Sequence, residues 1–207
     1  MAAILLLQIN FALFATIFLF CLFRSFNLNI ILVGLTYLLP LVPWWLGSAQ
    51  VDRILIVSYS NLIFGIIEIV FFTLTERQED VKFNKAYLQQ LFGHVLPIIA
   101  ALIGMSFVSR TTLIPVDMWE LFLIAILFTF GTTLRILAIS QLGLLRFKFN
   151  IAFREKQTLK TDQLHSYMRH PTYTGMMIVV LAYAVTTHSW SAGIIGIFFA
   201  LFGFQYR

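Results

Sequence analysis

Residues 169–175 read RHPTYTG and directly precede an apolar run, so their types suggest a binding site at the start of a helix. Pro171 suits the first turn of a helix, where its missing N–H group removes no hydrogen bond. The unpaired N–H groups of such a turn, together with the positive end of the helix, attract anions. Arg169 adds a planar cation that can bind a carboxylate through two parallel hydrogen bonds, and His170 adds a ring donor and acceptor.

Aromatic and small residues complete this segment. Tyr167 and Tyr173 supply amphipathic rings, and Gly175 lets a helix or a ligand approach the backbone closely. Together these groups suit a small ligand with a carboxylate and a flat ring. The alternative is that arginine, histidine and tyrosine serve as snorkelling and belt residues where a helix enters a membrane. The whole string, placed after a long basic loop and before a helical hairpin, favours a functional site.

The composition places this segment in a membrane protein. Hydrophobic residues make up 60% of the 207 residues and charged residues only 11%, whereas soluble domains carry roughly a quarter charged residues. The apolar residues form long unbroken runs, which a bilayer solvates and water does not. The net charge of +5 therefore indicates basic cytoplasmic loops rather than a nucleic-acid partner. We expect a lipid bilayer as the surrounding partner.

The fold class predicted from these runs is all-α, a polytopic transmembrane helical bundle of about seven spans. At about 20 residues for each crossing, the spans fall at residues 4–23, 28–46, 54–74, 91–108, 118–142, 173–187 and 191–206. They must be helical, because unpaired backbone groups in lipid are costly. The last two spans form a helical hairpin that follows the loop 143–171. We interpret the first span as a retained helix rather than a cleaved signal peptide.

The basic residues predict the orientation of the bundle. If the loop 143–171 lies in the cytoplasm, alternation of the spans places only Arg53 and Arg110 on the opposite side, which leaves 12 of the 14 lysines and arginines inside. The N-terminus is then non-cytoplasmic. The membrane itself is either that of the endoplasmic reticulum or a bacterial inner membrane.

RHPTYTG resembles the RHPxYxG signature of the isoprenylcysteine carboxyl methyltransferase family, a clan of integral membrane methyltransferases that includes phospholipid methyltransferases. The similarity extends upstream, because Arg135, Ala138 and Leu142-Gly143 resemble the family's R-x-x-A-x-x-x-LG stretch. Leu159 and Thr161 resemble its L-V-T element. The resemblance covers residues 130–207, and the helices before it carry no signature of this kind.

The resemblance implies a site for S-adenosylmethionine on the cytoplasmic side. Arg169, His170, Tyr173 and Gly175 carry over as cofactor-binding residues, with Tyr167 as a further member and Leu159 contributing backbone groups. Arg169 and Tyr173 are the residues that we assign to catalysis. From charge alone we infer that Arg169 meets the methionine carboxylate of the cofactor. The scattered histidines show no spacing for metal ligands, so no metal site is expected.

The sequence also departs from the family pattern. Thr158 or Gln157 stands where the family usually has a histidine, and His165 stands near the place of a tyrosine. The sequence ends at Arg207, which resembles the arginine that begins the family's next element, and the glutamates that follow in the family have no counterpart here. Either the sequence is shortened after Arg207, or the protein lacks groups that close the cofactor site. The second case motivates the alternative of a non-catalytic membrane subunit or binding protein that keeps a degenerate cofactor fold.

We therefore expect a methyltransferase that uses S-adenosylmethionine and acts on a lipidic or prenylated acceptor. A carboxylate acceptor is favoured because it needs no general base, and no strongly placed base is visible. We assign residues 1–115 to N-terminal transmembrane helices of open role and residues 116–207 to the methyltransferase-like domain. A transporter ranks last, because no paired halves are apparent.

Charged and titratable residues outside the signature have interpretations of their own. Glu68 lies deep in the third span, and a functional and a structural role are equally plausible for it. His94 is expected at the membrane interface. Asp117 and Glu120 suit the start of the fifth span as structural acids, and His188 is expected to be solvated in the hairpin turn.

Overall fold

The computed structural model describes residues 2–43, 50–75, 85–142 and 163–205, and these ranges contain helices and short connections but no strand. The prediction of an all-helical chain is therefore confirmed for this part. The helices are α1 (Ala2–Arg24), α2 (Leu28–Leu38), the 3₁₀ turn η1 (Leu39–Leu41), α3 (Val51–Thr75), α4 (Lys85–Gln90), the π-helix η3 (Leu91–Val95), α5 (Leu96–Thr111), α6 (Met118–Leu142), α7 (Leu164–Tyr167), α8 (Pro171–Thr186) and α9 (Trp190–Gln205).

Helix length separates the apolar segments into two groups. The segments Ile4–Arg24, Val51–Leu74, Tyr87–Thr111 and Met118–Gln141 are long and apolar enough to cross a membrane. The apolar helices Leu28–Leu41, Pro171–Thr186 and Trp190–Gln205 are shorter. The structure thus supports four candidate spans, and the predicted count of about seven is not confirmed. For the second segment, the α-helical hydrogen bonds give way to the 3₁₀ turn that contains Pro40.

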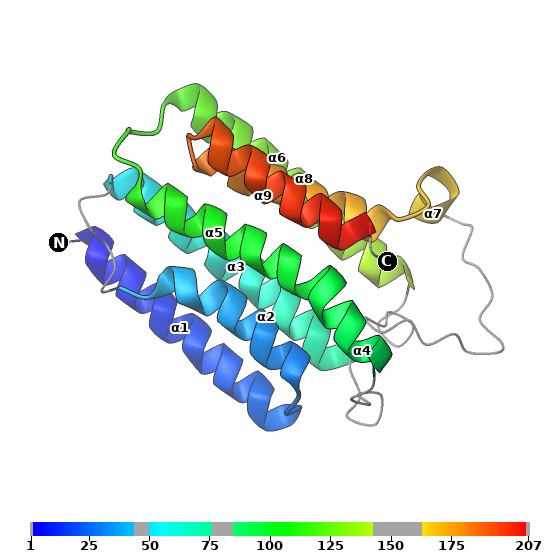
Figure 1. Ribbon diagram of the computed structural model, residues 1–207. Helices are drawn as coiled ribbons and strands as arrows, with labels where there is room; N and C mark the ends of the chain where they lie inside the picture. Colours follow the sequence, from blue (N-terminus) through cyan, green and yellow to red (C-terminus); the bar gives the residue numbers. More distant parts are fainter. Residues whose placement is uncertain (1, 44–49, 76–84, 143–162, 206–207) are drawn as a thin grey trace.

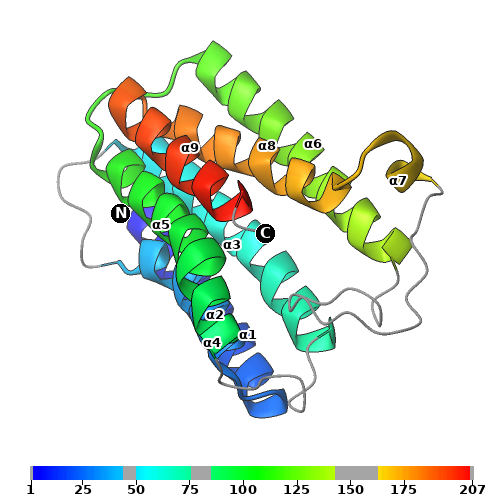
Figure 2. The same ribbon diagram turned by 45° about the vertical axis from the view of Figure 1, so that its right-hand side comes forward.

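The long helices run alternately in opposite directions along the chain, as Figure 1 shows. On one side of the bundle α1, α2 and α3 contact one another, and on the other side α6 lies along α8. α5 connects the two groups, because it packs against α2, α3, α8 and α9 (Figure 2). α8, which begins with the signature, therefore has neighbours on several sides.

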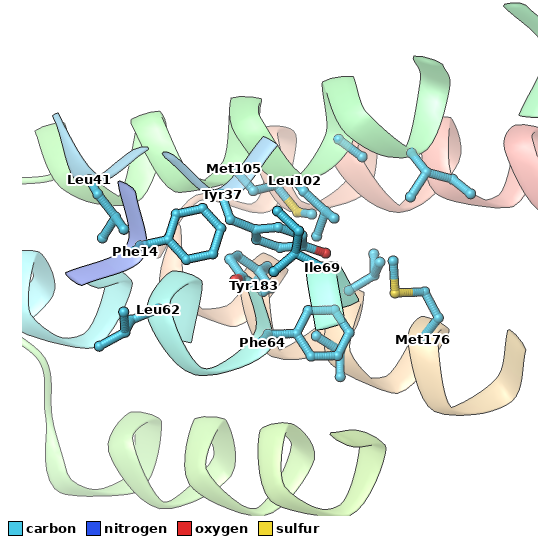
Figure 3. Packing of buried hydrophobic residues seen from close by; sticks show 14 of the residues in the cluster. Phe14, Tyr37, Leu41, Leu62, Phe64, Ile69, Leu102, Met105, Met176 and Tyr183 are labelled. Atoms are coloured by element: carbon cyan, nitrogen blue, oxygen red, sulfur yellow. The ribbon is translucent and has the colours of Figure 1, made fainter. Parts of the chain in front are cut away.

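Edge-to-face aromatic contacts link the helices through the core. Tyr37 of α2 packs against both Phe14 of α1 and Phe64 of α3 (Figure 3). Its ring centroid lies 6.5 Å from that of Phe14 and 5.8 Å from that of Phe64. The ring of Phe64 in turn packs against that of Phe128 of α6, with the two ring centroids 6.1 Å apart. Such contacts favour fixed ring geometry beyond simple burial. The core thus ties the N-terminal helices to α6.

A buried polar network closes the end of the bundle at which α6 begins. Arg53 donates to both carboxylate oxygens of Glu120 at 2.8 and 2.9 Å and to the carbonyl oxygen of Thr186 at 2.7 Å. His188 is 3.2 Å from the same carboxylate, so it is only partly solvated. This network joins α3, α6 and the α8–α9 turn. Arg110, at the same end, donates to the carbonyl oxygens of Pro40 in η1 and of Val42 directly after η1.

Candidate functional site

The signature begins α8 as the sequence predicts. His170 precedes the helix with non-helical dihedral angles, φ −138° and ψ 64°, and Pro171 occupies the first helical position. Arg169 and His170 are exposed, whereas Pro171 and Thr172 are buried. The two basic groups therefore lie at an open helix start, while the helix itself enters the packed bundle at once.

The first turn of α8 offers fewer N–H donors than its sequence suggests. Pro171 has no N–H group, and the N–H groups of Tyr173 and Thr174 both donate to the carbonyl oxygen of His170 at 3.1 Å. The second of these bonds is the ordinary first bond of the helix. An anion at this helix start would therefore depend on the side chains of Arg169 and His170 more than on backbone donors.

Tyr173 brings four rings together, and we call these residues the ring cluster: His94, His170, Tyr173 and Phe204. The centroid of the Tyr173 ring lies 5.9 Å from His170, 5.9 Å from His94 and 5.4 Å from Phe204. These residues come from the start of α8, from η3 and from the end of α9. The ring cluster thus joins the signature to two segments distant from it in sequence.

His94 is buried within the protein rather than placed at an interface, so that expectation was wrong. It is 1% exposed and lies in the π-helix η3, two residues before α5 begins at Leu96. A π-helix adds a residue to the turn and is frequent at functional sites. Nδ1 of His94 is 2.5 Å from the carbonyl oxygen of Gly203. Because a carbonyl only accepts, Nδ1 carries the proton in this contact.

A partly enclosed cavity of about 60 Å³ lies beside the ring cluster. It is lined mainly by apolar side chains of the N-terminal helices and α8, among them Val33, Phe72, Ile98, Leu102 and Met176. Glu68, His94, Arg135 and Tyr173 contribute its polar lining, together with Thr36 and Tyr37. The cavity therefore has an almost entirely apolar wall, and Tyr173 of the signature forms part of it.

Glu68 and Arg135 form a buried ion pair in this wall. Nη2 of Arg135 donates to Oε2 of Glu68 at 2.7 Å, and Nε donates to Oε1. The side chains are 5% exposed for Arg135 and 3% for Glu68. Nη1 of Arg135 donates to the carbonyl oxygen of Thr172 at 3.2 Å. A fork of this kind fixes the guanidinium in a defined plane, and charges in a protein interior need such partners.

Gly175 allows the close approach of a helix. A Cβ atom placed on Gly175 would lie 2.8 Å from the backbone nitrogen of Arg135 and 2.8 Å from the carbonyl oxygen of Gly131. A Cβ atom on Gly131 would meet the carbonyl oxygen of Gly175 at the same distance. α6 and α8 therefore touch backbone to backbone at this point. Contact between Gly175 and a cofactor stays a prediction.

The remaining predicted site residues are less closely associated. Tyr167 ends the short helix α7 and is 88% exposed, so its ring contributes nothing to the ring cluster. A hydrogen bond from the N–H group of Leu164 to the side chain of Gln141, at 3.2 Å, links α7 to α6. Leu159 and Arg207 lie outside the described residues.

Sequence reasoning missed two members of this arrangement. His94 carries no spacing that links it to the signature, because its contacts to Tyr173 and Gly203 depend on how η3 and α9 pack. Glu68 did carry a signal, since a carboxylate inside a span is costly and needs a partner. The partner is Arg135, which the sequence singles out only as the first residue of the stretch that resembles the family's R-x-x-A-x-x-x-LG pattern.

Comparison with known proteins gives one match. Residues 123–207 match the model of the isoprenylcysteine carboxyl methyltransferase (ICMT) family, so the resemblance seen in the signature is confirmed for this region. The matched region contains most of α6 and all of α8 and α9, whereas Glu68 and His94 lie before it. No curated protein and no solved structure matches the chain.

Proposed function

We propose that the chain transfers a methyl group from S-adenosylmethionine to a lipidic or prenylated acceptor, because residues 123–207 match the isoprenylcysteine carboxyl methyltransferase family. The acceptor group that fits best is a carboxylate, as in an isoprenylcysteine. A methyltransferase embedded in a membrane follows from the family match and the apolar helices. The cofactor, the acceptor and the site residues are the proposed part.

One observation carries the proposal: the signature presents two different surfaces within five residues. Arg169 and His170 are exposed and basic, whereas Tyr173 lines an apolar cavity inside the bundle. A polar, charged cofactor and an apolar acceptor need such surfaces, and they need them close together for the reacting atoms to align. A residue that served only as an interfacial belt would have no reason to line a cavity.

The donor set fits the cofactor. Arg169 can bind the methionine carboxylate with a bidentate hydrogen-bond pair, and His170 adds a second donor beside it. The rings of Tyr173 and Phe204, whose centroids are 5.4 Å apart, provide flat apolar surface beside the ring of His170. When bound, S-adenosylmethionine supplies a methyl group that its sulfonium already activates.

With a carboxylate acceptor, the protein has to align the acceptor oxygen with the methyl group and to exclude water from it. It does not have to remove a proton. A carboxylate is ionised at neutral pH, so its oxygen can form the new O–C bond while the S–C bond breaks. The negative charge of the acceptor and the positive charge of the sulfonium disappear together. The apolar cavity lining favours this loss of charge, because it solvates separated charges poorly.

We also propose an orientation for the bundle, with the loop 143–171 in the cytoplasm and the N-terminus on the opposite side. Cys21 is the one cysteine in the sequence and it is buried, so it interferes little with labelling of introduced cysteines. Cysteines placed at Ser166 and at Ser191 should react with a membrane-impermeant maleimide from opposite sides of sealed vesicles. Reaction of both from the same side would refute the orientation.

The first experiment is calorimetry of S-adenosylmethionine binding to the purified protein in nanodiscs. Wild type should bind saturably, and Arg169→Ala should bind about 10–100-fold more weakly, because a charged hydrogen-bonded pair contributes about 1.5–3 kcal/mol. Arg24→Ala removes an exposed arginine at the end of α1 and serves as the matched control. Equal affinity in all three proteins would refute the cofactor site.

The acceptor class can be tested with a cofactor that carries a radioactive methyl group. A farnesylated cysteine derivative with a free carboxylate should become labelled, and mild base should release the label as methanol because the product is an ester. The same derivative with its carboxylate amidated is the control. Label that resists base, or equal labelling of both compounds, would refute a carboxylate acceptor.

A further inference from the structure

Glu68 connects the N-terminal helices to the signature through one intermediate residue. It lies in α3, outside the region 123–207 that matches the family, and it accepts two hydrogen bonds from Arg135 of α6. Both side chains line the cavity and both are almost fully buried. An ion pair of this kind is costly to keep in an apolar interior unless its geometry is well satisfied.

The same guanidinium reaches the first turn of α8. Nη1 of Arg135 donates to the carbonyl oxygen of Thr172, the residue directly before Tyr173. The polar chain Glu68–Arg135–Thr172 therefore crosses three helices and ends at the signature backbone. The contacts described here use three of the five N–H donors of Arg135.

We propose that Glu68 is a positioning residue for methyl transfer, and this inference rests on the proposed function. Its carboxylate holds the guanidinium of Arg135 in the plane from which Nη1 bonds Thr172. Without that charge, Arg135 is an unpaired buried cation, and its guanidinium has to shift toward another acceptor or toward water. Either shift breaks the hydrogen bond to Thr172. The ring of Tyr173 and the other residues that line the cavity then lose their fixed relation, so Glu68 acts on the reaction through Arg135.

The protein contains a matched control for this proposal. Arg53 and Glu120 form a second buried pair, in which two nitrogens of Arg53 meet both oxygens of Glu120 at 2.8 and 2.9 Å. Arg53 also donates to a carbonyl oxygen of α8, that of Thr186. The two pairs thus have the same chemistry and similar burial, but the second lies at the opposite end of α8 from the signature.

The experiment compares Glu68→Gln and Glu68→Asp with Glu120→Gln and Glu120→Asp in nanodiscs. Methyl transfer is measured as kcat for each cofactor-binding site, with the sites counted by calorimetry. Both glutamine variants should lower the melting temperature, because each leaves a buried arginine without its counter-charge. Only the Glu68 variants should lower kcat per site, by a factor on the order of 100 for misplacement near 1 Å.

This readout separates positioning from folding. A purely structural role of Glu68 would reduce the number of binding sites and leave kcat per site unchanged. The aspartate variant keeps the charge and shortens the side chain, so it decides the question where the glutamine variant does not fold. Wild-type kcat per site in Glu68→Asp, or an equal loss in Glu120→Asp, overturns the proposal. Wild-type protein that binds no S-adenosylmethionine instead refutes the proposed function, and the positioning role with it.

Discussion

The contact between Gly203 of α9 and the π-helix allows a sharp test of how the ring cluster is built. A Cβ atom on Gly203 would lie 2.8 Å from the carbonyl oxygen of His94 and 2.8 Å from Cγ1 of Ile98. The first of these atoms belongs to the backbone, so it cannot turn away as a side chain does. In Gly203→Ala, α9 therefore has to move away from η3 and α5.

The loss of stability expected for Gly203→Ala can be worked out by comparison with a glycine in open surroundings. Gly104 of α5 has no atom within 4 Å of the place where its Cβ would be, so Gly104→Ala creates no clash. Both substitutions bring the same gain in helix propensity, about 1 kcal/mol, which cancels in the difference. What remains is the cost of overpacking, about 1–3 kcal/mol. For a chain of this size that corresponds to a melting temperature about 2–12 °C lower than that of Gly104→Ala.

The assay is thermal unfolding in nanodiscs, followed by tryptophan fluorescence, with methyl transfer measured on the same samples. The carbonyl oxygen of Gly203 accepts from His94 at 2.5 Å, so moving α9 also disturbs the ring that faces Tyr173. We expect Gly203→Ala to lose activity at temperatures where it is still folded. Equal melting temperatures and equal activity in the two variants would refute the described packing of α9 against η3.

Three further predictions concern other contacts. Gly175→Ala should destabilise the protein by about 1–3 kcal/mol in thermal unfolding, because its Cβ would clash with the backbone of Gly131; a melting temperature at or above that of wild type would contradict the close approach of the two helices. Tyr173→Phe should retain most cofactor affinity in calorimetry, since the ring contacts persist, whereas Tyr173→Ala should lose it; equal loss in both would assign the effect to the hydroxyl group instead. Asp117→Ala should cost about 1 kcal/mol, because the carboxylate accepts the N–H group of Glu120 at 2.7 Å at the start of α6, and Asp117→Asn should restore the stability.

The apolar runs predicted the helices well, because the bilayer permits few alternatives. The span expected at 118–142 coincides with α6, and the expected hairpin at 173–187 and 191–206 lies close to α8 and α9. Pro171 and the following apolar residues predicted where α8 begins. The lengths of the helices were predicted less well, since the described part of the span expected at 28–46 contains the short helix α2 and the 3₁₀ turn at Pro40.

The site could be predicted only where it is local in sequence. Arg169, His170 and Tyr173 lie together because they follow one another at a helix start. The pairing of Glu68 with Arg135 depends on the rotation of two helices about their axes, which hydrophobicity alone does not determine. The position of His94 depends on the π-helix, and the sequence Leu91–Val95 contains nothing that distinguishes it from an α-helical turn.

The hydrogen bond between Arg135 and Thr172 also fixes the depth of the signature relative to α6. The 25 residues of α6 extend about 37 Å, little more than the roughly 30 Å of a hydrocarbon core. Arg135 lies seven residues before Leu142, about 10 Å from that end of the helix. Because Arg135 bonds the first turn of α8, we expect the buried start of α8, with Tyr173, to lie within the thickness of the core and the exposed Arg169 to lie nearer its surface. Under the proposed function, a lipidic acceptor then reaches Tyr173 sideways without lifting its reactive end into water, whereas the charged cofactor binds Arg169 from the cytoplasmic side.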